Sequence, residues 1–173
     1  MAADPFPLHH RSEALLAIDI ARLFAHLDDH RRLASHMEKP SLMTAGASMH
    51  IDIDERQGQA VGSVIRMTGT LLGLRLSVEE VVMHRQPPRE KVWQTIGEPR
   101  LLVVSAYRMG FTITPHAQGS RLMVSIDYRL PARGLERVLG WLLGRVYAAW
   151  CTQRMVDDAR AAFGKTGPRR GER

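Results

Sequence analysis

The sequence predicts an α+β domain in which a curved antiparallel sheet of about seven strands wraps around one long C-terminal helix. Three observations predict this class. Apolar residues recur with helical spacing over residues 135–163, a period of two dominates residues 42–130, and only short turns interrupt that second region. Short turns force neighbouring strands to pair antiparallel. Because the helices fall at the ends of the chain and do not alternate with strands, the class is α+β.

The N-terminal part of the chain predicts one strand followed by two short helices. Residues 13–18 form the expected strand, and Asp19 can cap the first helix. Asp28 is a second capping residue, and Pro40 ends the second helix. Apolar residues recur at helical spacing in the first helix at Ile20, Leu23, Phe24 and Leu27, and the second helix runs through His30, Leu33, Ala34 and Met37.

Alternating polar and apolar residues predict six further strands. Turn residues separate them at Gly58, at 86–89, at 97–99 and at 116–120, and Pro131 ends the last strand. The expected segments are residues 49–53, 61–72, a stretch from 74, 91–96, 101–114 and 122–130.

The final helix carries more apolar surface than a solvated end helix needs. We expect this apolar face to lie across the sheet. Its members are Leu135, Leu139, Leu142, Val146, Ala149 and Trp150.

Composition predicts a single domain and excludes several functions. The chain has 173 residues, of which 45% are hydrophobic, enough for a core with a cavity. Half of the formal charge of +6 comes from residues 165–173, and no aromatic residues interleave with clustered arginines, so we expect no nucleic-acid partner. We expect a flexible segment over residues 1–12, one domain over 13–163 and a disordered basic tail over 164–173.

The chain shows no pattern of export or membrane insertion. Residues 1–11 lack a basic segment followed by an apolar one, and the most apolar run, 138–151, contains Arg145 and is too short to span a bilayer. The single cysteine, Cys151, excludes an internal disulfide and fits a reducing compartment. We therefore expect a cytoplasmic protein without stable membrane insertion.

Three short segments carry a resemblance to a known family. Residues 23–30 (LFAHLDDH), 93–95 (WQT) and 107–111 (YRMGF) resemble the helix-grip fold of the START-like superfamily, which includes polyketide cyclase-like proteins, lipid-transfer proteins and the birch-pollen allergen family. The resemblance covers residues 13–163. It implies an apolar cavity between the sheet and the last helix, and carriage of a hydrophobic small molecule such as a lipid, quinone or polyketide-like compound.

Aromatic side chains with polar tips suit the lining of such a cavity, although the same residues could simply fill a solid core. We expect no cofactor. The residues that we expect to contact the ligand are Leu76, Trp93, Tyr107, Met109, Tyr128, Leu139, Leu142 and Val146.

Glu80 is the candidate for catalysis. The period of Leu74, Leu76 and Val78 places Glu80 on the inner face, where a carboxyl group could act as an acid or a base. In a cyclase or dehydratase of this fold, Tyr107 or Tyr128 would position an oxygen. A bulge could instead turn Glu80 to solvent, and we favour this alternative because unpaired charges are rarely buried.

Other reactive residues have simpler explanations. His26 and His30 have the spacing of two metal ligands on a helix, and His36 lies nearby, but no cysteine or clear third ligand completes a site. Cys151 lies beside Trp150 in an apolar helix, which favours structural burial. Phosphate-binding loops and nucleophilic serine motifs are both missing from the sequence. We expect no metal.

Small residues spaced by four form a stripe on the last helix. Gly140, Gly144 and Ala148 lie away from Leu142 and Val146. Such a stripe permits close approach of a second helix, so a homodimer is one possibility, and tolerated glycines on a solvated face are the other.

Overall fold

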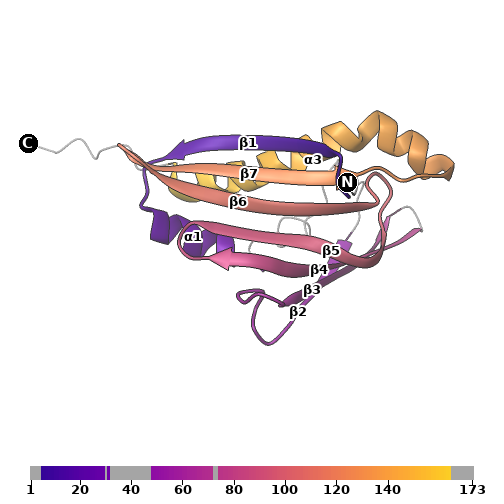
Figure 1. The fold of residues 1–173 in the computed structure, drawn as a ribbon, viewed down its shortest axis with the longest axis horizontal. Coiled ribbons are helices and arrows are strands. Elements are labelled where there is room, and N and C mark those ends of the chain that lie inside the picture. Colours follow the sequence, from indigo (N-terminus) through magenta and orange to yellow (C-terminus); the bar gives the residue numbers. More distant parts are fainter. Residues whose placement is uncertain (1–4, 30, 32–47, 72–73, 165–173) are drawn as a thin grey trace, which may run out of the picture.

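The computed structural model describes residues 5–29, 31, 48–71 and 74–164, and these form a seven-stranded sheet with two helices (Figure 1). In chain order the elements are β1 (Leu8–Leu16), α1 (Ile20–Asp28), β2 (Ser48–Ile53), β3 (Val64–Leu71), β4 (Leu74–Gln86), β5 (Glu90–Arg100), β6 (Ala106–His116), β7 (Gly119–Arg129) and α3 (Gly134–Phe163).

The sheet is antiparallel and open, with the strand order β1-β7-β6-β5-β4-β3-β2. The first strand therefore pairs with the last one, and β2 forms the opposite edge. Helix α3 lies along β1 and β7, and α1 packs near β6 (Figure 1). The predicted α+β class and the long C-terminal helix are confirmed.

Local signals explain several of these elements. The Asp19 side chain caps α1 by accepting a hydrogen bond of 2.9 Å from the Arg22 backbone N–H, as predicted. The predicted turns between β4 and β5 and between β6 and β7 also form. The inner positions of β7 are buried as the alternation predicts, at Leu122, Val124, Ile126 and Tyr128.

Three predicted boundaries are wrong. Strand β1 begins at Leu8 and not at residue 13, because it pairs with β7 along its whole length. The glycine of the expected 97–99 turn has a φ of +66°, but β5 continues past it to pair Arg100 with Ser77 of β4. The following chain leaves the sheet, so β6 begins at Ala106. The predicted second short helix and the basic tail lie almost wholly outside the described residues.

Helix α3 packs through its small residues, and the predicted orientation is wrong. Leu142 and Val146 are 56% and 54% exposed, whereas Gly140 and Gly144 are buried. A Cβ atom at Gly140 would lie 2.8 Å from Pro131 Cδ and 2.9 Å from the Val103 carbonyl oxygen. The glycines thus allow the helix backbone to approach the end of β7.

The same packing corrects the predicted homodimer surface. The face formed by Gly140, Gly144 and Ala148 lies against the protein's own chain, and Gly144 faces the side chains of Leu130 and Tyr128. A second helix cannot use this face while α3 remains docked.

Candidate functional site

A carboxyl group is buried on the inner face of the sheet. Glu80 is 4% exposed and lies between the buried residues Val78 and Val82 of β4. The pairing of β4 with β5 shifts register between Ser77 and Glu79 and between Val82 and His84, but Val78, Glu80 and Val82 remain alternate buried positions of β4. The favoured prediction, that a bulge turns Glu80 to solvent, is therefore wrong.

Glu80 has hydrogen-bond donors from two other strands. The hydroxyl of Tyr107 on β6 donates to Glu80 Oε1, and the indole N–H of Trp93 on β5 also donates to the carboxyl group. Burial raises the pKa of Glu80 to about 7, although these two donors and the positive charge of Lys91 act in the opposite direction. At neutral pH the group is therefore able both to accept and to donate a proton.

Helix α3 contributes two further polar side chains. Tyr147 and Cys151, one helical turn apart, are hydrogen-bonded to each other and lie close enough to Glu80 to feel its charge. Burial raises the pKa of Cys151 to about 12, so the thiol stays protonated at neutral pH. Tyr147 was not predicted from the sequence as a site residue. Its position four residues before Cys151, one helical turn away, was the signal that could have identified it.

The structure brings together only part of the predicted ligand-contacting set. Buried positions on the inner face of the sheet hold Trp93, Tyr107, Met109 and Tyr128. Two more members, Leu76 and Leu139, are half-buried, whereas Leu142 and Val146 lie on the exposed side of α3.

A hollow of about 420 Å³ opens where the sheet meets the start of α3. Its lining combines the beginning of β4, the end of β5 and the first turn of α3. Leu76 in this lining lies on the same face of β4 as Glu80, with Val78 between them. The lining residues are Leu74, Arg75, Leu76, Pro99, Arg100, Leu101, Leu102 and Glu136.

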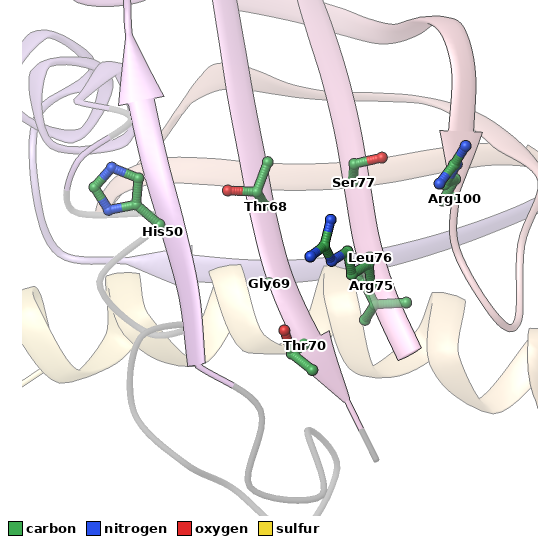
Figure 2. Close-up of a pocket in the computed structure, with 8 residues that line it drawn as sticks. All are labelled: His50, Thr68, Gly69, Thr70, Arg75, Leu76, Ser77 and Arg100. Atoms are coloured by element: carbon green, nitrogen blue, oxygen red, sulfur yellow. The ribbon is translucent and has the colours of Figure 1, made fainter. Parts of the chain in front are cut away.

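A second hollow, of about 710 Å³, spans β2, β3 and β4 (Figure 2). Along each strand, the polar residues of this hollow occupy the positions between the buried residues. They therefore belong to the outer face of the sheet, as does the ion pair of Arg66 with Glu79. Guanidinium groups with neighbouring hydroxyls can hold an anion, which differs from the apolar chamber expected from the sequence. The side chains that carry this polarity are His50, Thr68, Thr70, Arg75, Ser77 and Arg100.

Comparison with known proteins identifies the architecture. No family model and no curated protein matches the chain. Solved structures do match. Ara h 8.0201 is 14% identical over 90% of this chain and 96% of its own, with a TM-score of 0.60. Protein CV1439 from Chromobacterium violaceum is 16% identical over 91% and 97%, with a TM-score of 0.57.

A third similar structure is the di-domain ARO/CYC StfQ from the steffimycin biosynthetic pathway. It is 13% identical over 91% of this chain and 51% of its own, with a TM-score of 0.63. The chain has the START-like, helix-grip fold. At these identities the likeness concerns the fold, and the site must be judged from its own residues.

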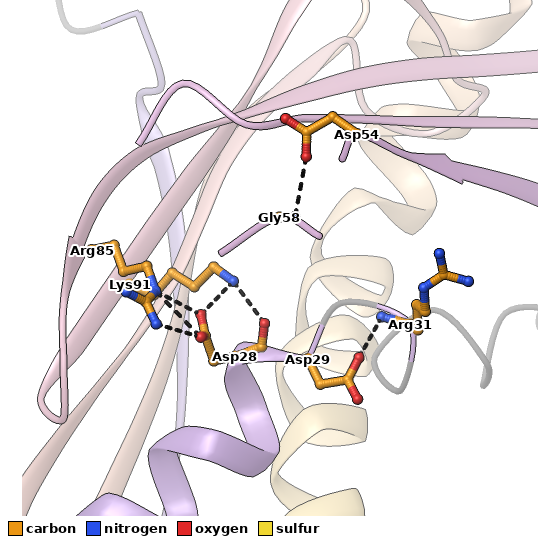
Figure 3. Close-up of polar contacts among 7 residues, drawn as sticks. All are labelled: Asp28, Asp29, Arg31, Asp54, Gly58, Arg85 and Lys91. Carbon is orange, nitrogen blue, oxygen red and sulfur yellow. Dashed lines mark hydrogen bonds and ion pairs between the residues drawn. The ribbon is translucent and has the colours of Figure 1, made fainter. Parts of the chain in front are cut away.

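Within this START-like fold, a buried ionic cluster joins α1 to the β4–β5 hairpin (Figure 3). Lys91 Nζ, fully buried, donates to Asp28 Oδ1 at 2.8 Å and to the Asp28 carbonyl oxygen at 2.9 Å. Arg85 donates to Asp28 Oδ2 at 2.7 Å. Burial alone would raise the pKa of Asp28, but the hydrogen bonds from Arg85 and Lys91 hold it below its ordinary value.

This cluster has a structural role. Burial lowers the pKa of Lys91, an effect that the bond to Asp28 opposes. Figure 3 also shows two local bonds, from Arg31 N–H to Asp29 and from Gly58 N–H to Asp54, which tie turns of the chain. The carboxylates of Asp28, Asp29 and Asp54 therefore all accept hydrogen bonds from other groups of the protein itself.

The part of the chain that the structure describes contains no group of three or more potential metal ligands. His26 was a candidate metal ligand from the sequence. Its Nε2 lies 3.2 Å from Asp158 Oδ2, and its ring packs edge-on against Phe163. His30 and His36 lie outside the described residues. The START-like inner face therefore offers the Glu80–Tyr107 pair as its main chemical group.

Proposed function

We propose that the protein binds an apolar small molecule between the inner face of the sheet and α3. The observation that carries this proposal is the hydrogen-bonded pair of Glu80 and Tyr107, buried among apolar side chains. A few polar groups within an apolar lining are typical of sites that orient a hydrophobic ligand. Polar anchoring by Glu80 suits a ligand with a hydroxyl or carbonyl oxygen, as in a lipid alcohol, a quinone or a polyketide-like compound.

The contacting residues follow from the burial pattern. Trp93, Met109 and Tyr128 would pack against the ligand from the sheet, and Leu76 and Leu139 would do so near the hollow between the sheet and α3. Leu142 and Val146 are left out because they are exposed on the other side of the helix. The single cysteine supports a cytoplasmic location for this binding.

Native mass spectrometry of the purified protein, with extraction of any co-purifying compound, tests this proposal. We expect a reproducible apolar adduct, and a rise in melting temperature with members of a panel of lipids, quinones and aromatic polyketides. No adduct and no thermal shift across the whole panel would contradict it.

A second candidate is a cyclase or dehydratase reaction in the same site. The observation that favours it is the pKa of about 7 for Glu80, which matches the requirement for a general acid or base at neutral pH. Tyr107 would hold the substrate oxygen next to that group. Glu80→Gln separates the two candidates, because a catalytic role predicts lost turnover with retained binding, whereas a carrier changes only in affinity.

A further inference from the structure

The face of α3 turned away from the sheet is apolar and unpartnered among the described residues. Trp141 is 77% exposed, although it is the largest side chain on the first half of the helix. A row of this size on one face exceeds the scattered apolar residues of ordinary surfaces. We define the exposed α3 surface by Leu135, Val138, Trp141, Leu142, Leu143 and Val146.

Arginines border this surface. The segment from 133 to 146 has three exposed arginines, Arg133, Arg137 and Arg145, against one carboxylate, Glu136. The hollow where the sheet meets α3 brings Arg75 and Arg100 to the same end of the molecule.

Leu74, at the start of β4, lines that hollow and is itself exposed, so this end of the molecule carries a further exposed apolar side chain. Figure 1 shows the start of α3, the start of β4 and the end of β5 together at one end of the molecule. Glu98, two residues before Arg100 on β5, contributes an acidic side chain to this region. Positive charge therefore dominates around the exposed apolar side chains.

We propose that the exposed α3 surface docks peripherally on an anionic lipid bilayer. A helix face with tryptophan and leucines, flanked by arginines, is the pattern of an interfacial helix, in which apolar side chains enter the acyl boundary and arginines meet lipid phosphates. None of the described helices is long and apolar enough to cross a bilayer.

Charge favours a lipid surface over a second copy of the chain. Two copies that met through this face would bring Arg133, Arg137 and Arg145 of each close together, with Glu136 as the only carboxylate of that segment. An anionic bilayer pairs with all of these arginines. Docking does not require the proposed ligand site, but it would place the hollow between the sheet and α3 next to the lipid.

Vesicle sedimentation of the full chain tests the proposal. The probes are vesicles of phosphatidylcholine alone and vesicles of phosphatidylcholine mixed with phosphatidylglycerol. We expect binding to the mixed vesicles, weaker binding to the neutral ones, and a loss of binding as salt concentration rises. Brominated lipid should quench tryptophan fluorescence in the wild type and much less in Trp141→Phe.

Matched variants separate docking from general effects of charge. Leu142→Glu should weaken binding to the mixed vesicles by roughly tenfold or more, whereas Leu15→Glu, at an equally exposed leucine of β1 (57%), should not. Arg137→Glu should weaken binding more than Arg154→Glu, which changes the net charge equally on the far half of α3.

Three outcomes would overturn the proposal. The first is no sedimentation with either vesicle. The second is equal loss in Leu142→Glu and Leu15→Glu, or in Arg137→Glu and Arg154→Glu. The third is a dimer in solution that Leu142→Glu converts to a monomer while vesicle binding stays absent, which would assign this surface to a second copy.

Discussion

The hydroxyl of Tyr107 on β6 donates a hydrogen bond to the buried carboxyl group of Glu80 on β4, across the intervening strand β5. This bond joins two side chains of the buried layer, one of which is the ionisable carboxyl group of Glu80. Its energetic consequences can be measured without knowledge of any ligand.

Glu80 should make the protein less stable as pH rises through neutrality. Its pKa is raised from 4.5 to about 7 in the folded state, so between these values the folded protein holds a proton that the unfolded chain has released. The free energy of unfolding should fall across this window by up to about 3 kcal/mol through this group alone. Urea denaturation at pH 5 and pH 8 measures the change.

Glu80→Gln should flatten that dependence, since the amide cannot ionise. The matched control is Glu79→Gln, on the outer face of the same strand, where Glu79 forms an exposed ion pair with Arg66. We expect the control to keep the pH slope of the wild type. A Glu80→Gln protein with the wild-type slope would show that the carboxyl group titrates normally.

Tyr107→Phe should raise the pKa of Glu80 further. The Tyr107 hydroxyl opposes the effect of burial by donating to the carboxylate, so its removal leaves the charged form less stabilised. Titration of the Glu80 carboxyl carbon by NMR should give a midpoint above that of the wild type. A midpoint that moves down would mean that water replaces the hydroxyl.

Asp28→Asn should cost about 3–5 kcal/mol of stability, because it removes the carboxylate that faces both Lys91 and Arg85. Lys91→Met should cost less, since Asp28 keeps its bond to Arg85. The pKa of Asp28 is held below 3.8, so its stabilisation is present above that value and is lost as pH falls through the folded pKa. Denaturation at pH 7 should show a larger loss of unfolding free energy in Asp28→Asn than in Lys91→Met. Equal losses in the two variants would contradict this account.

Gly140→Ala should destabilise the protein by about 1–3 kcal/mol, although alanine is the better helix former. The new methyl group would meet the Val103 carbonyl oxygen and Pro131, which cannot move freely. Gly144→Ala should cost less, because it meets mainly Leu130 Cδ2, the end of a flexible side chain. Stabilisation of the protein by Gly140→Ala would show that this face is not packed as described.

Local rules predicted most of the fold. The Asp19 cap, the turns after Gln86 and His116, and the buried alternation of β7 depend on neighbouring residues, so the sequence contains their full cause. The exceptions depend on distant partners. Residues 97–99 stay within β5 because pairing with β4 resumes beyond them, between Arg100 and Ser77, which no local turn rule could predict.

The candidate site was harder to predict for the same reason. Alternation placed Glu80 on the inner face, but its hydrogen-bond donors are on β5 and β6, and their register is not visible in the sequence. Helical spacing grouped Leu135, Leu142 and Val146 on one face of α3, and these three side chains do share its exposed side. The error was to assign that face to the sheet, because the close fit of Gly140 against Val103 and Pro131 decides which face is buried.

A titration with a neutral apolar compound that carries one hydroxyl group, such as a long-chain alcohol, tests the central proposal most directly. Native mass spectrometry would follow the complex in the wild type, in Glu80→Leu on the inner face and in His50→Gln in the outer hollow. The account predicts a one-to-one complex, weakened by roughly tenfold in Glu80→Leu through the lost polar anchor and unchanged in His50→Gln. No complex with any panel compound, or a complex weakened only by His50→Gln, would contradict it.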